Sequence, residues 1–181
     1  MCENMKRRMK QRAAVRGMPG GGFTLIEVIL VVLIIGIAAA VVVPMASSAS
    51  GMQLRAAVNM VAADIEYAKS MAISRGQRYS VVFNKTSETY QVVDQAGTVI
   101  AHPVKKGFNY VIDFRNDGRL DQVEILDASF DATNKVTFDY LGSPYNGSST
   151  PLNSGVVTLQ SGTMTRTVSV EPVTGFISVS N

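Results

Sequence analysis

The sequence predicts an α+β protein in which a long N-terminal helix packs on an antiparallel β-sheet or on two packed β-sheets. Three observations carry this prediction. Apolar residues fill positions 23–43 almost without interruption, apolar residues recur at helical spacing over 54–72, and short segments of β-type residues follow from position 79 to the end. Since no helical pattern follows residue 76, strands alone are expected to cover the helix.

The first half of the helix, 23–44, is predicted to cross a membrane. Of 21 consecutive residues from Phe23 onward, only Thr24 and Glu27 are polar. A helix of that length measures about 32 Å, which matches a hydrocarbon core of ~30 Å. Residues 1–22 carry six basic side chains and one acidic side chain, so the positive-inside rule places the N-terminus in the cytoplasm.

Glu27 needs a partner, because a carboxylate in the middle of a membrane span costs about 2.5 to 3.5 kcal/mol. One interpretation is a helix cap, since Thr24-Leu25-Ile26-Glu27 fits the S/T-x-x-E capping box. The other is a cut before Phe23, which creates an α-amino group that Glu27 neutralises in the same subunit or in a neighbouring one. The rival interpretation of the region is a secretory signal peptide cut near 47–49. It gives Glu27 no role, and the apolar run exceeds the usual h-region of about 7 to 15 residues.

The second half of the helix, 45–76, is predicted to be amphipathic. Its apolar residues recur at steps of three and four and form one stripe, made of Leu54, Val58, Val61, Ile65, Ala68 and Ala72. Gly76 suits the position that follows a helix, so the helix should end near Arg75. A bend is expected at Pro44, because proline removes a backbone donor from the helix.

The rest of the chain is predicted to form short strands. The candidate segments are each bounded by Gly, Pro, Asn or Asp, and they are 79–83, 89–93, 98–101, 109–114, 123–126, 135–140, 155–160, 165–171 and 176–180. The first two are expected to form a hairpin. Residues 141–151 hold no strand or helix signal and are predicted to be a mobile surface loop.

The charge of the chain is divided unevenly at residue 22. The whole chain has a net charge of +3 and a pI near 9.1, but residues 1–22 alone contribute +5 from six basic side chains and one acidic side chain. The remaining 11 basic and 13 acidic side chains sum to −2, which argues against a nucleic-acid partner. Cys2 is the only cysteine, so a chain cut after residue 22 has neither a disulfide nor a thiol nucleophile.

No motif of a common enzyme class is present, so neither catalysis nor a cofactor is expected. His102 is the only histidine, which excludes a metal site or an acid/base pair built from several histidines. It is predicted to be an ordinary surface histidine or one with its hydrogen bonds satisfied. The sequence has no G-x-S-x-G elbow, no S-x-x-K and no P-loop.

One segment approaches a calcium loop. Positions 1, 5, 6, 9 and 12 of such a loop are occupied by Asp113, Asp117, Gly118, Asp121 and Glu124. Arg115 stands at position 3, where a ligand should be, so its charge would repel the cation. A plain turn at 116–118 between two strands is the favoured interpretation, and no metal is expected.

Gly22 followed by Phe23-Thr24-Leu25-Ile26-Glu27 resembles the prepilin cleavage and methylation motif of type IV pilins and type II secretion pseudopilins. The resemblance implies a cut after Gly22 by a prepilin peptidase, N-methylation of Phe23 and a role for Glu27 in filament assembly. Gly36 and Pro44 stand where this family commonly has a helix-loosening glycine and a kinking proline.

Later segments are similar to the minor pseudopilin H and FimT-like branch of that family. They are the helix end at 68–76 before a valine-rich hairpin, and the ending at 166–170 followed by Thr174-Gly175. That branch often carries Arg after the terminal Thr-Gly, where this chain has Phe176, so a basic, DNA-contacting edge is not carried over.

The resemblance implies a minor pseudopilin of a type II secretion system. It divides the chain into a leader at 1–22, a transmembrane and assembly helix at 23–44, an amphipathic helix at 45–76 and a periplasmic β-rich domain at 77–181. The expected partners are other pseudopilins or pilins, the prepilin peptidase and inner-membrane lipid. Two alternatives stay open: a minor type IV pilin in pilus assembly or DNA uptake, and an exported binding module that uses the helix only as an anchor.

Overall fold

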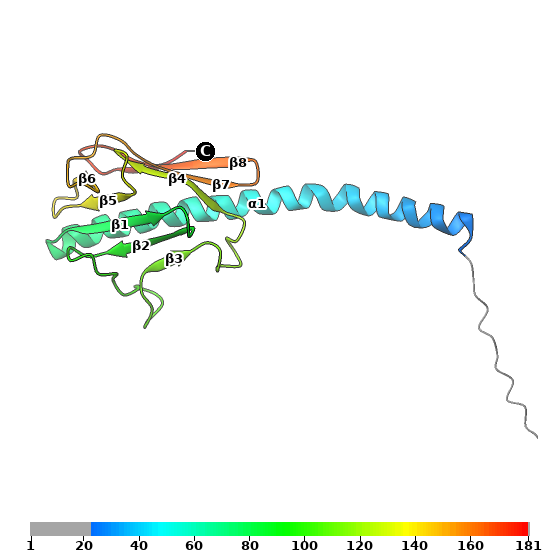
Figure 1. Ribbon diagram of the computed structural model, residues 1–181, viewed down its shortest axis with the longest axis horizontal. Helices are drawn as coiled ribbons and strands as arrows, with labels where there is room; N and C mark the ends of the chain where they lie inside the picture. The colour runs from blue at the N-terminus through cyan, green and yellow to red at the C-terminus, as the bar shows by residue number, and fades with distance from the viewer. Residues whose placement is uncertain (1–22, 181) are drawn as a thin grey trace, which may run out of the picture. The chain divides into compact units, whose positions relative to one another are not determined.

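The computed structural model describes residues 23–180, with side chains described for 23–40 and 49–180. The chain divides into two compact units, of which the first ends at residue 41 and the second begins at residue 42. One helix, α1 (Leu25–Arg75), contributes residues to both units, and the described strands all belong to the second unit (Figure 1). The helical character predicted for this region is confirmed, and the expected boundary at 44 and 45 lies inside α1.

Within residues 23–180, no helix reaches the combination of length and apolarity that a membrane crossing requires.

The C-terminal half of α1 carries the predicted buried stripe. The side chains without solvent exposure are Leu54, Ala57, Val58, Val61, Ile65, Ala68 and Ala72. The helix ends at Arg75, as predicted, because Gly76 takes a left-handed conformation at φ 63°. The amide of Gln77 then donates to the carbonyl of Ala72 at 3.3 Å, which satisfies one of the last helical carbonyls.

Two antiparallel sheets pack on this half of α1. The five-stranded sheet has the order β3-β2-β1-β5-β6, with β1 Tyr79–Asn84, β2 Thr89–Val93, β3 Val111–Asp113, β5 Lys135–Phe138 and β6 Pro144–Asn146. The four-stranded sheet has the order β4-β7-β8-β9, with β4 Glu124–Phe130, β7 Gly155–Ser161, β8 Met164–Val170 and β9 Ile177–Val179. The prediction of an α+β domain is therefore confirmed, and of the two arrangements that the sequence left open, one sheet or two, the structure has two.

One hydrophobic core joins the helix and both sheets. Aromatic rings connect the sheets within it. The ring of Phe83 in β1 lies 5.4 Å from Tyr90 in β2 and 5.8 Å from Phe130 in β4, measured between ring centroids. Tyr90 also contacts Phe114 in an edge-on arrangement at 5.8 Å.

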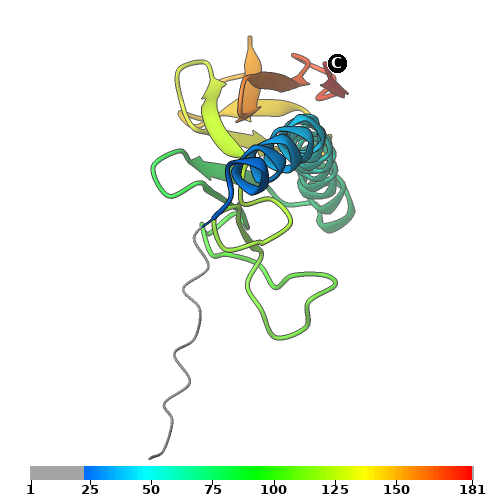
Figure 2. The same ribbon diagram turned by 90° about the vertical axis from the view of Figure 1, so that its right-hand side faces the viewer.

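Two sequence predictions about the strands are wrong. Residues 98–101 form only the isolated bridges of Val99 with Val93 and of Ala101 with Asn109. Together with the turn that follows, they make a segment that extends away from the sheets, drawn in green in Figures 1 and 2. The loop predicted at 141–151 contains β6, which pairs with β5. The turn after β6 is closed by Asn146, whose side-chain oxygen accepts hydrogen bonds from the amides of Ser148 and Thr150.

Candidate functional site

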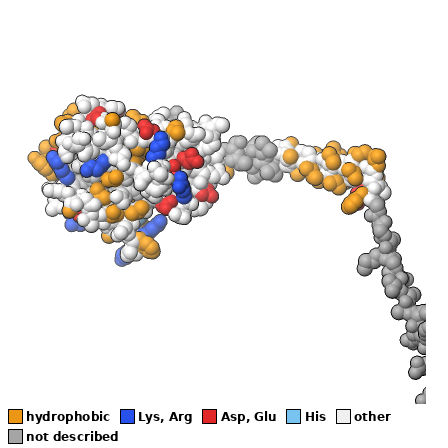
Figure 3. Space-filling model, viewed as in Figure 1, with side chains coloured by type: hydrophobic (Ala, Val, Ile, Leu, Met, Phe, Trp, Pro, Cys, Tyr) orange, Lys and Arg blue, Asp and Glu red, His pale blue; other side chains and the backbone are white. Residues whose placement is uncertain are grey.

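The N-terminal unit presents an apolar surface that nothing in the described chain covers. Its large apolar side chains from Phe23 to Ile37 are between 46% and 80% exposed. Figure 3 shows them as hydrophobic side chains spread along this part of α1. Soluble monomers rarely expose contiguous apolar patches of this kind, so such a surface marks contact with lipid or with other proteins.

Glu27 is the acidic residue in the first turn of this helix, and it forms the predicted capping box with Thr24. The Thr24 amide donates to Glu27 Oε2 at 3.4 Å, and the Glu27 amide donates to Thr24 Oγ1 at 3.3 Å. These bonds close the start of the helix, where the Glu27 amide also donates to the Thr24 carbonyl at 3.1 Å. Glu27 lies in the first turn, at the positive end of the helix dipole.

The other predicted positions in this region differ in how far the structure describes them. Gly22 lies outside the described residues, and Phe23 is described and 80% exposed. Gly36 is helical, and a Cβ added to it would meet no atom within 4 Å. Pro44 lies within the bounds of α1, but its side chain is outside the description. The predicted cut, methylation and bend stay predictions.

A buried carboxylate that sequence reasoning missed lies in the second unit. Asp64 stands among the buried residues of α1 and accepts hydrogen bonds from two phenols, Tyr90 OH at 2.6 Å and Tyr110 OH at 2.7 Å. Tyr90 belongs to β2, and Tyr110 precedes β3. The Asp64 side chain therefore connects α1 to β2 and to the residue that precedes the edge strand β3.

These contacts shift the titration of all three groups. Burial raises the pKa of Asp64, while the two phenol hydrogen bonds and the nearby His102 act in the opposite direction. Burial and the adjacent carboxylate raise the pKa of both tyrosines. The phenols therefore stay protonated as donors. The spacing of Asp64 seven residues after the buried Ala57 was the available sequence signal, because it places both on one helix face.

His102 takes a structural position. Its Nδ1 accepts hydrogen bonds from the amides of Val104 at 3.1 Å and Lys105 at 3.2 Å. Its ring lies 4.5 Å from the Tyr110 ring, measured between centroids. The prediction of a histidine with satisfied hydrogen bonds is confirmed.

The candidate calcium loop connects the two sheets. Asp113 ends β3 in the five-stranded sheet, and Glu124 begins β4 in the four-stranded sheet. A turn is present between them, since the Leu120 amide donates to the Asp117 carbonyl at 2.8 Å. Residues 23–180 contain no group of three or more His, Cys, Asp or Glu side chains that could hold a metal ion.

The loop carboxylates bind protein groups instead. Asp113 accepts from the amide and side chain of Asn116, and the side-chain bond chiefly lowers its pKa. Asp117 accepts two bonds from the Arg119 guanidinium, at 3.0 and 2.7 Å, which lower its pKa to about 2. Asp121 accepts from the side chain of Gln53 on α1 at 3.4 Å.

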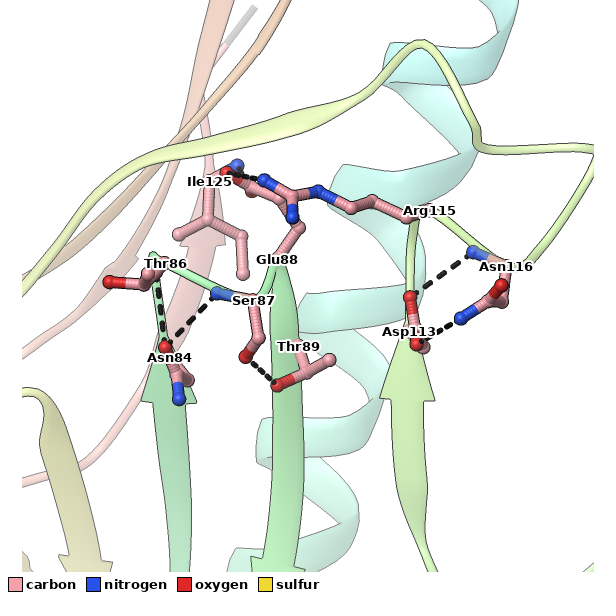
Figure 4. A network of polar contacts seen from close by, with 9 residues as sticks. All are labelled: Asn84, Thr86, Ser87, Glu88, Thr89, Asp113, Arg115, Asn116 and Ile125. Atoms are coloured by element: carbon pink, nitrogen blue, oxygen red, sulfur yellow. Dashed lines mark hydrogen bonds and ion pairs between the residues drawn. The ribbon is translucent and has the colours of Figure 1, made fainter.

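A second buried carboxylate, Glu88, holds this connection against the β1–β2 turn, as Figure 4 shows. It accepts a hydrogen bond from the Ile125 amide at the start of β4 and forms an ion pair with Arg115 at 4.0 Å. Its backbone takes a left-handed conformation at φ 56°, and its carbonyl accepts from the Phe114 amide at 3.1 Å. Arg115, whose positive charge disfavours calcium in this loop, therefore pairs with Glu88.

Comparison with known proteins supports a pilin-like fold. Residues 57–174 match the family described as type II transport protein GspH. The minor pseudopilin EpsH from the type 2 secretion system of Vibrio cholerae has a similar structure, with a TM-score of 0.51, 9% identity, and coverage of 70% of this chain and 95% of that one. The type IV minor pilin FimU of Pseudomonas aeruginosa has a TM-score of 0.48 and 20% identity, covering 71% of this chain and 88% of that one.

Among curated proteins, none matches the chain. The family match nevertheless covers more than half of the 181 residues, and the arrangement of α1 on two antiparallel sheets agrees with it. The chain belongs to the GspH family of type IV pilin-like proteins.

Proposed function

We propose that this protein is a minor pseudopilin, a structural subunit of a type II secretion pseudopilus that takes part in protein secretion across the outer membrane. It is made as a single-pass inner-membrane precursor, with its N-terminus in the cytoplasm and its β-rich domain in the periplasm. A prepilin peptidase cuts after Gly22, Phe23 is N-methylated, and the processed chain enters a periplasmic fibre. The family description, a type II transport protein, supports this role over that of a minor type IV pilin.

The observation that carries the proposal is the uncovered apolar surface of residues 23–40. Each of these residues is exposed in the isolated chain, and the large side chains among them are almost all aliphatic. Lipid covers such a surface before assembly, and the apolar helices of other pseudopilins cover it afterwards. The fibre is thus held together by lateral packing of N-terminal helices.

Glu27 gives this packing a fixed register. In the isolated chain its carboxylate caps α1, but the cap leaves the residue exposed and able to accept a further charge-assisted hydrogen bond. The α-amino group created at Phe23 of a neighbouring subunit is such a donor. A subunit out of register would leave both charges unpaired in an apolar bundle, which is strongly unfavourable.

The experiment compares Glu27→Val and Glu27→Gln in cells that express the other pseudopilins. Gln retains an oxygen that can cap Thr24 but carries no charge, so it separates capping from charge pairing. Both variants are expected to be cut and membrane-inserted, yet to copurify with the other pseudopilins about 10- to 100-fold less than wild type, the loss of one charge-assisted hydrogen bond. The readout is the amount of each variant in crosslinked pull-downs.

Glu66→Gln is the matched control, because Glu66 is an exposed acidic residue on the same helix. It should copurify as wild type does. If Glu27→Gln also copurifies normally while Glu27→Val does not, the capping box alone explains the residue and the charge-pairing role is wrong. Normal behaviour of both variants would reject any assembly role for Glu27.

A further inference from the structure

A polar groove of about 500 Å³ lies on the five-stranded sheet. Its walls are the segment that joins α1 to β1, the turn after β2, and the β5–β6 side of the sheet. The polar side chains that line it include those of Gln77, Arg78, Ser80, Asp94, Gln95, Lys135, Thr137 and Tyr140. The groove shares no residue with the apolar segment 23–40, so its role and the fibre role can fail independently.

The floor of the groove holds two buried hydroxyls. Ser80 in β1 and Thr137 in β5 are directly paired across the strands, and they are 5% and 7% exposed. Their neighbours Tyr79, Val81 and Phe138 point into the core, so these two point to the opposite face of the sheet. The hydroxyl oxygens are hydrogen-bonded to each other at 2.9 Å. That bond uses one hydroxyl hydrogen, and the other has no acceptor in the described part of the chain, which favours a ligand that brings an oxygen.

Two cations flank this floor. Neither Arg78 nor Lys135 is ion-paired within residues 23–180. The Arg78 guanidinium lies 5.2 Å from the centroid of the Tyr145 ring, a cation–π contact that orients it without neutralising it. Both cations can therefore receive an anionic group.

Asp94, the acidic residue of the lining, does not cancel this charge. Its Oδ1 accepts from the amides of Ala96 and Thr98, both at 2.9 Å, and so holds the turn after β2. With two cations and one carboxylate, the lining keeps a net positive charge. An anionic ligand is the electrostatic complement of the groove.

The size and the walls favour a peptide over a small ion. A hollow of about 360 Å³ adjoins the groove and shares with it the lining residues Gln77, Asp94, Gln95 and Ala96. The Gln95 Oε1 already accepts from the Arg78 amide at 3.4 Å, which leaves its Nε2 and the side-chain amide of Gln77 to pair with the backbone groups of an extended chain. Tyr140, 60% exposed at the rim, offers an aromatic surface for packing.

We propose that this groove binds an extended peptide segment of a partner protein through a carboxylate side chain. The carboxylate is received by Arg78 and Lys135 and accepts the free hydroxyl hydrogen of the Ser80–Thr137 pair. The backbone of the segment runs along the amide-lined wall beside Gln77 and Gln95.

The test uses the full-length protein in non-ionic detergent and a fluorescent hexaglutamate peptide with an amidated C-terminus. Fluorescence anisotropy at one fixed salt concentration should show saturable binding. Combining Arg78→Gln with Lys135→Gln should weaken binding at least about tenfold. Thr137→Val keeps the shape and charge of the floor and should weaken binding a few-fold. It also provides a readout if the double variant fails to fold, as judged by circular dichroism.

Matched controls distinguish specific binding in the groove from nonspecific electrostatic attraction. Combining Arg55→Gln with Lys106→Gln removes the same charge at two exposed positions outside the groove and should leave binding unchanged. An equal loss in both double variants, or equal binding of hexaglutamine, would overturn the proposal. Complete competition by inorganic phosphate at the concentration of the peptide would also overturn it, because the site would then hold only a small anion.

Discussion

Single carboxylates organise much of the second unit at the scale of residues. Asp64 binds the phenols of Tyr90 and Tyr110 to α1, and Glu88 holds Ile125 of β4 against the β1–β2 turn. Asp131 acts similarly, since it accepts from the amides of Asn153 and Ser154, and the Asn153 bond chiefly lowers its pKa. Each carboxylate satisfies donors on a segment distant in sequence.

Asp64→Ala should destabilise the domain by roughly 2 to 5 kcal/mol, because it leaves two buried phenol hydroxyls without an acceptor. Glu66→Ala, an exposed change two residues later, should alter stability by no more than about 0.5 kcal/mol. Denaturant unfolding of the full chain in detergent measures both. Equal stability of the two variants would show that Asp64 does not hold the tyrosines.

The same comparison has a predicted pH dependence. Because the pKa of Asp64 is raised above 3.8 on folding, the folded state binds the proton more tightly than the unfolded state. The resulting contribution of Asp64 to the free energy of unfolding is fully present below pH 3.8. It is lost as the pH rises through the folded pKa, with a limiting slope of about 1.4 kcal/mol per pH unit. The penalty of Asp64→Ala should therefore be larger at pH 4 than at pH 7, and the opposite trend would contradict the direction of the shift.

At the scale of elements, the turns decide how the strands are joined. The turn between β8 and β9 depends on Gly175, which has φ 58° and whose amide donates to the Glu171 carbonyl at 3.0 Å. A Cβ at this position would lie 2.7 Å from the carbonyl oxygen of Gly142 and 3.1 Å from the Phe138 ring. The turn thus packs its backbone directly on the β5–β6 connection, which explains why a glycine is needed at position 175.

Gly175→Ala should destabilise the domain more than Gly97→Ala does. Gly97 also has a positive φ of 80°, but a Cβ there meets nothing within 4 Å. Gly97→Ala should therefore show only the conformational cost of about 1 to 2 kcal/mol, whereas Gly175→Ala adds a steric cost of about 1 to 3 kcal/mol. Thermal unfolding of the two variants measures the difference, and an equal loss would mean that the backbone contact relaxes freely.

Sequence patterns correctly predicted those elements whose signals lie within a few neighbouring residues. The stripe and the end of α1, and the β1–β2 hairpin, were predicted correctly because their periodicity and their glycine signal lie within a few residues. β6 was missed because its short segment resembles a turn and becomes a strand only through pairing with β5. Asp64 and Glu88 were missed because their partners are 26 and 37 residues away.

At the scale of the whole molecule, charge and processing are linked. Residues 1–22 hold the excess of basic side chains, and the remainder has 11 basic and 13 acidic side chains. Under the proposed function, this basic segment would keep the N-terminus in the cytoplasm by the positive-inside rule. The proposed cut after Gly22 would therefore convert a basic precursor into a weakly acidic subunit.

Mass spectrometry of the native protein should therefore find an N-terminus at methylated Phe23, and isoelectric focusing should place the processed chain below pH 7. The precursor, with its pI near 9.1, should accumulate in cells that lack the peptidase. Gly22→Glu should block the cut and give the same accumulation in normal cells. An intact Met1, or a start near Ser50, in the native protein would reject this processing.

The sequence by itself determined the family motif at Gly22 to Glu27, the buried stripe of α1, the succession of short strands and the uneven charge. All of these depend on residues that are close together along the chain. Only the tertiary structure decided that the strands divide into two sheets, that Asp64 and Glu88 hold them, and that Arg78, Lys135 and two hydroxyls share one groove. These features depend on long-range pairing, and sheet register is set by packing of distant side chains that no local pattern encodes.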